Sequence, residues 1–194
     1  LLYQRIDATW IQEQLQQHSI AEIVDKEWTG LVIQPLSLPT ALKMLVGWTK
    51  EKADTSSFVS SVTHTRTQAE KDAYYQQFLK ENTIILKQLT TALTNEDTKA
   101  FLQGITDNRA LLLDFAKEMN IVLETPSLTK LCQIALQENV SAKTSGAGGG
   151  DCGICFITKP QQEETITTQW EKAGILPLNL EIAPSKGAIR KELS

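Results

Sequence analysis

Residues 143–158 have the sequence KTSGAGGGDCGICFIT, in which a run of glycines leads directly into an apolar segment. Four of the five residues from 146 to 150 are glycine. Glycine loses more conformational freedom on folding than any other residue, so such a run weakens a regular helix or strand. What it permits is a backbone at positive φ whose exposed N–H groups approach a ligand, and successive N–H groups of this kind bind anions. The segment 152–158 predicts a strand immediately after the loop.

Three other interpretations of the glycines fit less well. Gly148, Gly150 and Gly153 match the dinucleotide-binding pattern G-x-G-x-x-G, but that pattern requires a following helix and residues 154–157 predict a strand. A P-loop ends in Gly-Lys-Ser or Gly-Lys-Thr, whereas aspartate and cysteine follow Gly150. A flexible linker is not expected to be followed so closely by a strand. We therefore interpret residues 143–153 as an anion-binding loop.

The segments on either side of this loop predict an α+β fold. No proline stands between Pro39 and Pro126, which suits a series of long helices. The predicted helices cover residues 8–17, 20–25, 55–67, 69–93, 97–119, 127–138 and 163–173, with Asp7 as the N-cap of the first. The predicted strands cover residues 31–36, 42–48, 152–158 and 175–182, and the first two form a hairpin. This order is typical of an antiparallel sheet with helices on one face.

Charge and composition exclude two classes of partner. The net charge of −4 argues against non-specific nucleic-acid binding, which needs a basic face. No apolar run approaches the roughly 20 residues that cross a bilayer, so we expect a soluble protein with no membrane partner. Three cysteines are an odd number, which does not suggest a disulfide framework and favours a cytoplasmic location.

Cys152 and Cys155 have the C-x-x-C spacing of redox and zinc sites, but we predict neither function and no metal site. A zinc site would need two more ligands, and Cys132, His18 and His64 are the only other cysteine and histidines in the chain. An offset of three along a strand also places two side chains on opposite faces.

The chain begins with LLYQRI, without methionine, and these residues predict the end of a strand that is already under way. They lack the basic segment followed by an apolar segment that marks a signal peptide. We therefore expect the chain to be a fragment that has lost the residues before it.

Two segments carry a resemblance to a known family. Residues 143–153 resemble the third motif of the GHMP kinases, and SGAGGGDCG is the form that this motif takes in bacterial phosphomevalonate kinases. Residues 46–49, VGWT, with Ala53 and the segment 55–57, resemble a second segment of the family, Val-Gly-Trp-Thr followed by Pro-Ala-Ser-Thr. The chain departs from that pattern with Lys52 in place of proline and with aspartate in place of serine at position 54.

The resemblance implies a ferredoxin-like GHMP kinase C-terminal domain over residues 29–194, preceded at 1–28 by the end of the amino-terminal domain. The implied reaction is the ATP-dependent phosphorylation of (R)-5-phosphomevalonate to 5-diphosphomevalonate in the mevalonate pathway of isoprenoid biosynthesis. Mg-ATP would bind mainly to the missing amino-terminal half, an intramolecular partner of this one. The catalytic residues are expected upstream of Leu1, so this half alone is expected to be inactive.

The resemblance also assigns residues to the site. The loop would bind substrate and the transferring phosphate through hydroxyl and N–H donors, at Ser145, Gly146, Ala147, Gly148, Gly149 and Gly150. Asp151 would orient the loop, with a position near Mg²⁺ as the alternative. Further candidate contacts are Lys143, Thr49 and Thr55.

Two alternatives stay open at this point. The chain could belong to another GHMP kinase, such as a mevalonate kinase, with a different acceptor. It could also be a non-catalytic ferredoxin-like module that binds an anionic metabolite or a partner chain. An exposed apolar face where another domain should dock would favour a fragment of an enzyme over such a module.

Overall fold

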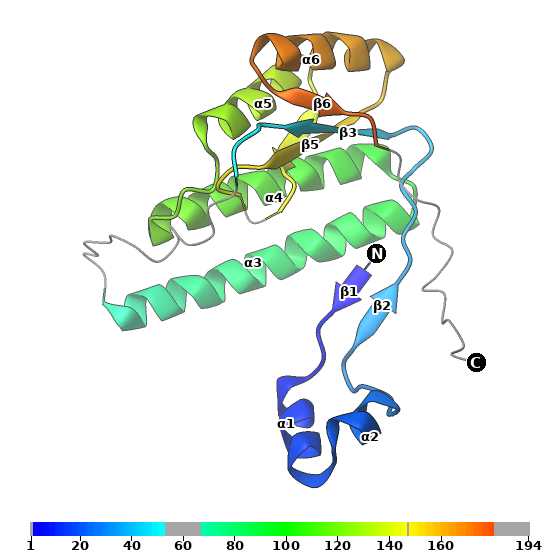
Figure 1. Cartoon of the computed structure of the whole chain (residues 1–194), viewed down its shortest axis with the longest axis vertical. Coiled ribbons are helices and arrows are strands. Elements are labelled where there is room, and N and C mark those ends of the chain that lie inside the picture. Colours follow the sequence, from blue (N-terminus) through cyan, green and yellow to red (C-terminus); the bar gives the residue numbers. More distant parts are fainter. Residues whose placement is uncertain (1, 53–66, 147, 181–194) are drawn as a thin grey trace. The chain divides into compact units, whose positions relative to one another are not determined.

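The computed structural model of the chain describes residues 2–52, 67–146 and 148–180 (Figure 1). These residues fall into two units that divide between Ser37 and Leu38. The predicted domain boundary after residue 28 stays a prediction. No helix within the described ranges is long and apolar enough to cross a membrane.

The first unit contains β1 (Leu2–Gln4), α1 (Ala8–Gln17), α2 (Ile20–Val24) and β2 (Val32–Gln34). α1 has the predicted bounds, and Asp7 caps it by accepting the N–H groups of Thr9 and Trp10. β2 pairs antiparallel with β1. The predicted hairpin between residues 31–36 and 42–48 is therefore wrong, because the strand at 42–48 belongs to a different sheet.

The second unit contains four strands and four described helices. They are β3 (Lys43–Trp48), α3 (Gln68–Thr94), α4 (Thr98–Met119), α5 (Pro126–Gln137), β4 (Ser141–Thr144), β5 (Cys152–Ile157), α6 (Pro160–Lys172) and β6 (Leu176–Leu178). The sheet has the order β4-β5-β3-β6, and all its pairs are antiparallel. Without α3 and α4, the chain order β3-α5-β4-β5-α6-β6 with this strand order is a ferredoxin-like fold. The predicted fold class is confirmed.

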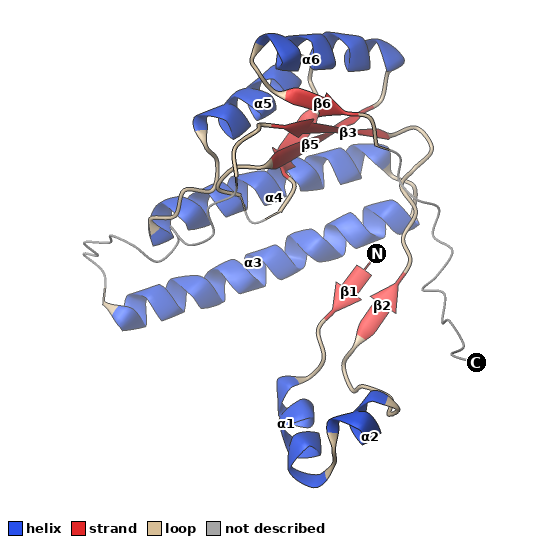
Figure 2. Cartoon of the chain, in the orientation of Figure 1, coloured by secondary structure: helices blue, strands red, loops and turns tan. Residues whose placement is uncertain are grey.

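Helices cover both faces of the sheet, and Figure 2 shows its strands between α6 and α4. Side chains alternate between the faces along β5. Cys155 and Ile157 join a buried cluster with residues of α5 and α6, including Trp170. On the other face, Phe156 packs edge-to-face on Phe101 of α4, with ring centroids 5.0 Å apart. The prediction of helices on one face thus holds for α5 and α6, whereas α4 packs on the face that was expected to be uncovered.

Most predicted elements of the second unit lie close to their predicted positions. α3, α4 and α5 correspond to the helices predicted at 69–93, 97–119 and 127–138. α6 begins at Pro160, earlier than predicted, because proline is well accommodated in the first turn of a helix. β4 was not predicted at all. The helix predicted at 55–67 lies almost entirely outside the described residues.

Candidate functional site

The glycine run forms the loop of the β4–β5 hairpin. Thr144 lies opposite Gly153 in the sheet, and the N–H of Ser145 donates to the carbonyl of Cys152 at 3.0 Å. Four consecutive residues then have positive φ: Gly148 (+80°), Gly149 (+77°), Gly150 (+134°) and Asp151 (+64°). The glycine run therefore occupies the left-handed backbone region that the sequence indicated.

The segment before α5 holds one side of the loop. The N–H of Gly149 donates to the carbonyl of Leu123 at 2.8 Å. A Cβ atom added to Gly148 would lie 2.2 Å from the same carbonyl oxygen, a distance that no real side chain tolerates. Only glycine fits at position 148 in this arrangement, because both the positive φ and the close approach exclude a side chain.

The residues after β3 hold the other side of the loop. The carbonyl of Asp151 accepts hydrogen bonds from the N–H of Thr49 at 2.9 Å and from its Oγ1 at 2.7 Å. The N–H of Asp151 donates to the carbonyl of Glu51 at 2.9 Å. Asp151 is thus held by its main chain, while its exposed side chain accepts a long contact of 3.6 Å from the Sγ of Cys152 and no other from the described residues.

Glu51 also reaches the start of α5 with its side chain. Its carboxylate accepts hydrogen bonds from Thr125 Oγ1 at 2.6 Å and from Ser127 Oγ at 2.7 Å. These two bonds lower the pKa of Glu51, and the bond from Thr125 has the larger effect. The sequence analysis missed Glu51. Its position two residues after the VGWT segment was the only available signal.

A buried ion pair fixes the segment that receives the loop. Nε of Arg109 lies 2.7 Å from Oε1 of Glu124, and its Nη2 lies 2.8 Å from Oε2. The two side chains are only 18% and 4% exposed, and the hydrogen bond to Glu124 raises the pKa of Arg109. This bidentate ion pair holds Glu124 in place. It thereby positions the carbonyl of the neighbouring Leu123, which accepts the hydrogen bond from the N–H of Gly149.

The start of the loop is open to a ligand, whereas Gly148 and Gly150 are buried. Ser145 and Gly146 are exposed, and a Cβ atom added to Gly146 would meet nothing within 4 Å. Within the described part of the chain, no hydrogen bond uses the N–H groups of Gly146, Gly148 or Gly150. The N–H of Gly149, predicted as a ligand donor, is instead used by Leu123.

Lys143 lies on β4 next to the loop and is half-buried. Burial lowers the pKa of its ammonium group, and among the described residues it has no hydrogen-bond or ion-pair partner. The hydroxyl of Thr49, a predicted candidate contact, binds Asp151. The candidates Ala147 and Thr55 lie outside the described residues.

The three thiols are free, and the pKa of each is raised mainly by burial. Cys132 and Cys155 are fully buried, with pKa values of about 12. Burial and the neighbouring Asp151 raise the pKa of Cys152. Protonated thiols are poor nucleophiles and metal ligands.

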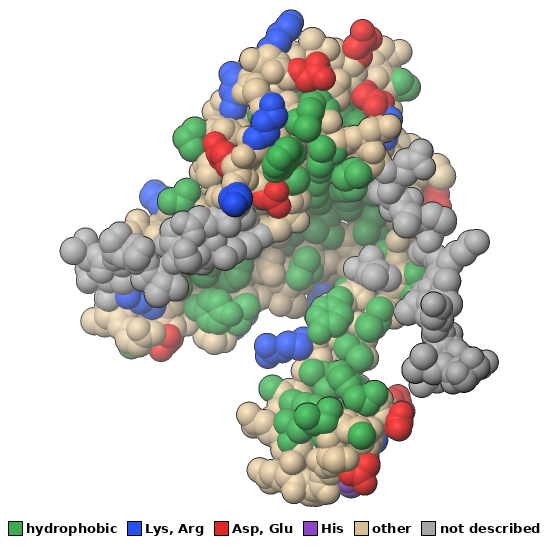
Figure 3. Space-filling model, viewed as in Figure 1, with side chains coloured by type: hydrophobic (Ala, Val, Ile, Leu, Met, Phe, Trp, Pro, Cys, Tyr) green, Lys and Arg blue, Asp and Glu red, His purple; other side chains and the backbone are tan. Residues whose placement is uncertain are grey.

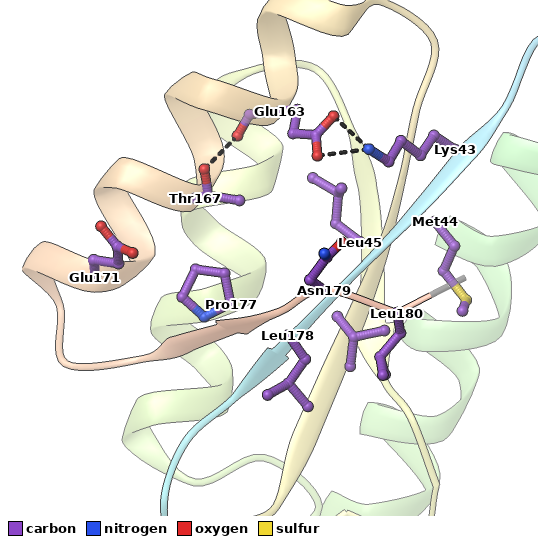
Figure 4. A pocket seen from close by; sticks show the side chains of 11 residues that line it. Lys43, Met44, Leu45, Glu163, Thr167, Glu171, Pro177, Leu178, Asn179 and Leu180 are labelled. Carbon is purple, nitrogen blue, oxygen red and sulfur yellow. Dashed lines mark hydrogen bonds and ion pairs between the residues drawn. The ribbon is translucent and has the colours of Figure 1, made fainter. Parts of the chain in front are cut away.

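A separate cavity of about 260 Å³ lies between β3, α6 and β6 (Figure 4). Nζ of Lys43 lies 2.6 and 2.7 Å from the two carboxylate oxygens of Glu163 at its rim. Its lining includes no residue of the glycine loop, and the ion pair is exposed. The loop itself, rather than this cavity, therefore carries the candidate site.

Comparisons with known proteins agree with this architecture. Residues 89–176 match the family described as GHMP kinases C terminal. A phosphomevalonate kinase of Streptomyces sp. (strain CL190) is 34% identical over 182 residues, which cover 93% of this chain and 48% of that protein.

Two solved structures share the fold over most of the chain. The Lin0012 protein from Listeria innocua has a TM-score of 0.80 at 29% identity, covering 92% of this chain and 50% of that one. Streptococcus pneumoniae phosphomevalonate kinase, in complex with phosphomevalonate and AMPPNP, has a TM-score of 0.70 at 28% identity, with coverages of 89% and 49%. The chain spans about half the length of these relatives.

The sheet order, the helices on its two faces and the family match over residues 89–176 agree with one another. The chain carries a GHMP kinase C-terminal domain.

Proposed function

We propose that the chain supplies the acceptor side of a phosphomevalonate kinase, which phosphorylates (R)-5-phosphomevalonate to 5-diphosphomevalonate with ATP in the mevalonate pathway. The observation that supports this most is the loop at 148–151, with four consecutive positive φ angles, in which no hydrogen bond of the described residues uses the N–H groups of Gly148 and Gly150. The similarity to two phosphomevalonate kinases, one of them solved with phosphomevalonate and AMPPNP, favours this acceptor.

Phosphoryl transfer requires mainly that the reactants be positioned and that the charge of the transferring group be stabilised. We propose that the Ser145 hydroxyl and the N–H groups of Gly146, Gly148 and Gly150 bind the acceptor and the transferring phosphate. Lys143, which precedes the loop on β4, would add positive charge. In the proposal Asp151 orients the loop through its main chain, and Ala147 and Gly149 complete the loop.

Mg-ATP is proposed to bind mainly to the amino-terminal half that GHMP kinases have. Within the described part of this chain, no group of three His, Cys, Asp or Glu side chains could hold a metal ion. Asp151 is proposed in its orienting role because its main chain is held by Thr49 and Glu51.

The test is an assay of ADP release by the complete polypeptide that contains this chain. Phosphomevalonate, mevalonate and homoserine are offered separately, with a reaction without acceptor as the control. We expect turnover with phosphomevalonate alone. Turnover with another acceptor instead would place the chain in a different GHMP kinase. No turnover with any acceptor, from a folded protein, would favour the binding module.

Ser145→Ala should lower the turnover of the complete polypeptide by roughly tenfold to a thousandfold, the scale of one lost transition-state donor. Ser145 is exposed, and its hydroxyl makes no hydrogen bond with the residues that the structure describes. Thr158→Ala, which removes an exposed hydroxyl beyond the other end of β5, is the matched control and should change little. Activity of Ser145→Ala within twofold of wild type would remove Ser145 from the site.

We also propose that residues 1–28 pack against the amino-terminal half. In the described part of the first unit only Ile23 is buried, at 2% exposure. Figure 3 shows hydrophobic side chains gathered on this unit. Its exposed large apolar side chains are Tyr3, Leu15, Ile20, Val24, Val32 and Ile33. So short a unit with almost no core needs a partner surface to be stable.

Limited proteolysis tests this docking proposal. We expect cleavage within residues 2–37 to be at least about tenfold faster in the isolated chain than in the complete polypeptide, because docking suppresses local opening. The rate at sites in the second unit is the internal control. Equal rates of cleavage in both forms would contradict the proposal.

A further inference from the structure

Glu51 lies where the three segments of the site meet. Its carbonyl receives the N–H of Asp151 in the glycine loop, and its carboxylate receives the hydroxyls of Thr125 and Ser127 at the start of α5. The hydrogen bonds of Thr49 described above join β3 to the loop alone. Those of Glu51 connect the loop to the start of α5.

α5 also has an N-cap of its own. Thr125 is the N-cap of α5, and its hydroxyl oxygen accepts the N–H of Leu128 at 3.4 Å. The same hydroxyl donates its hydrogen to Glu51. Removing the Glu51 side chain therefore leaves the capping interaction intact, and what is lost is the connection between α5 and the loop.

The charge of Glu51 suits this position. Its carboxylate lies at the amino-terminal end of a helix of 12 residues, where the helix dipole favours an anion. Both hydrogen bonds are charge-assisted and therefore stronger than bonds between neutral groups. The connection is accordingly rigid enough to fix the distance between α5 and the backbone that carries Asp151.

We propose that Glu51 is a positioning residue, which holds the glycine loop against α5 so that the N–H groups of the loop keep the geometry that binds the acceptor. This inference rests on the proposed function, because it assigns Glu51 to the acceptor side of that reaction. In this proposal Glu51 does not contact the acceptor or ATP. It acts indirectly, by holding Asp151 and the segment that carries Leu123.

The experiment compares Glu51→Ala and Glu51→Gln in the complete polypeptide. Glu51→Ala should raise the KM for the phosphorylated acceptor about tenfold or more, and leave the KM for ATP within about twofold. Hydrogen exchange at the amides of Gly149 and Asp151 should become about tenfold faster. Glu51→Gln should have a KM for the acceptor and a rate of loop exchange close to those of wild type. Its amide oxygen still accepts a hydrogen bond from one of the two hydroxyls, and the hydroxyl that loses its acceptor can rotate.

Glu163→Ala is the matched control, because it removes an exposed carboxylate of α6, which pairs with Lys43 of β3, without touching the loop. It should leave both KM values and the exchange of the two loop amides unchanged. A general loss of stability would instead accelerate exchange at core amides such as that of Cys155 as much as at the loop. That result in Glu51→Ala would overturn the inference.

The inference also fails if Glu51→Ala leaves loop exchange within twofold of wild type, or raises both KM values equally. Exchange is measured without substrate, so it is independent of the identity of the acceptor. If the wild-type polypeptide phosphorylates no acceptor, the proposed function fails, and the role of Glu51 in that reaction fails with it. Unchanged loop exchange in an active enzyme overturns the role of Glu51 alone.

Discussion

Gly148→Val in the complete polypeptide should lower the rate of phosphoryl transfer by more than about a thousandfold. This loss is larger than the one expected when a single hydrogen-bond donor is removed. A β-branched residue at a φ of +80° is a backbone outlier, and such strain costs about 1–3 kcal/mol. The added Cβ would also lie 2.2 Å from the carbonyl oxygen of Leu123. The loop must therefore leave Leu123, which breaks the hydrogen bond from Gly149 and displaces the neighbouring N–H groups.

Steady-state kinetics with the phosphorylated acceptor, together with urea unfolding, measure this effect. Gly148→Ala should fall between wild type and valine, because its Cβ meets the same carbonyl without the added branch. Gly146→Ala serves as the control for stability, since a Cβ there meets nothing within 4 Å. Normal affinity for the acceptor in Gly148→Val would show that the loop is not held against Leu123 in the enzyme.

The second large effect is expected at Leu131, which is completely buried on α5. Gly47 and Gly153 lie directly opposite each other in the sheet, and added Cβ atoms there would lie 2.8 and 2.6 Å from methyl carbons of Leu131. Leu131 therefore fills the space that two missing side chains leave. Leu131→Ala should lower the free energy of unfolding by about 2–5 kcal/mol, because it removes buried methyl groups and leaves a cavity.

A double-mutant cycle tests whether the packing of Leu131 on Gly153 causes the expected loss of stability. Gly153→Ala alone should destabilise by about 1–3 kcal/mol through overpacking. In the double variant with Leu131→Ala, the new methyl group enters the vacated space, so the combined loss should be smaller than the sum by about 0.5–3 kcal/mol. Urea unfolding of all four proteins measures the cycle. Strictly additive losses would contradict direct packing between Leu131 and the glycine pair.

Local signals in the sequence were enough to predict the helices and the loop. α5 begins and ends one residue earlier than predicted, because Thr125 and Pro126 form a strong starting signal. The glycine run predicted positive φ correctly at three of its positions, Gly148, Gly149 and Gly150. These features depend on neighbours in the sequence, so they can be predicted without knowing the fold.

Pairing between distant segments could not be predicted in the same way. The turn at residues 38–40 suggested a hairpin, but β3 is apolar enough to lie between β5 and β6, and it pairs with both. β4 has the short and mostly polar sequence SAKT, and only pairing with β5 identifies it as a strand. Glu51 has its side-chain partners 74 and 76 residues away. Each of these contacts depends on the completed fold.

The strand order also determines when the sheet can form during synthesis on a ribosome. β3 is made before the helices α3 and α4, whereas its partner β5 follows about a hundred residues later and β6 later still. The helices α3 and α4 are adjacent in sequence and can pair while the nascent chain is still growing. Leu45 and Val46, buried in the finished protein, stay without their sheet partners until the last part of the chain emerges. This interval exposes an apolar strand to aggregation and makes it a natural target for chaperones.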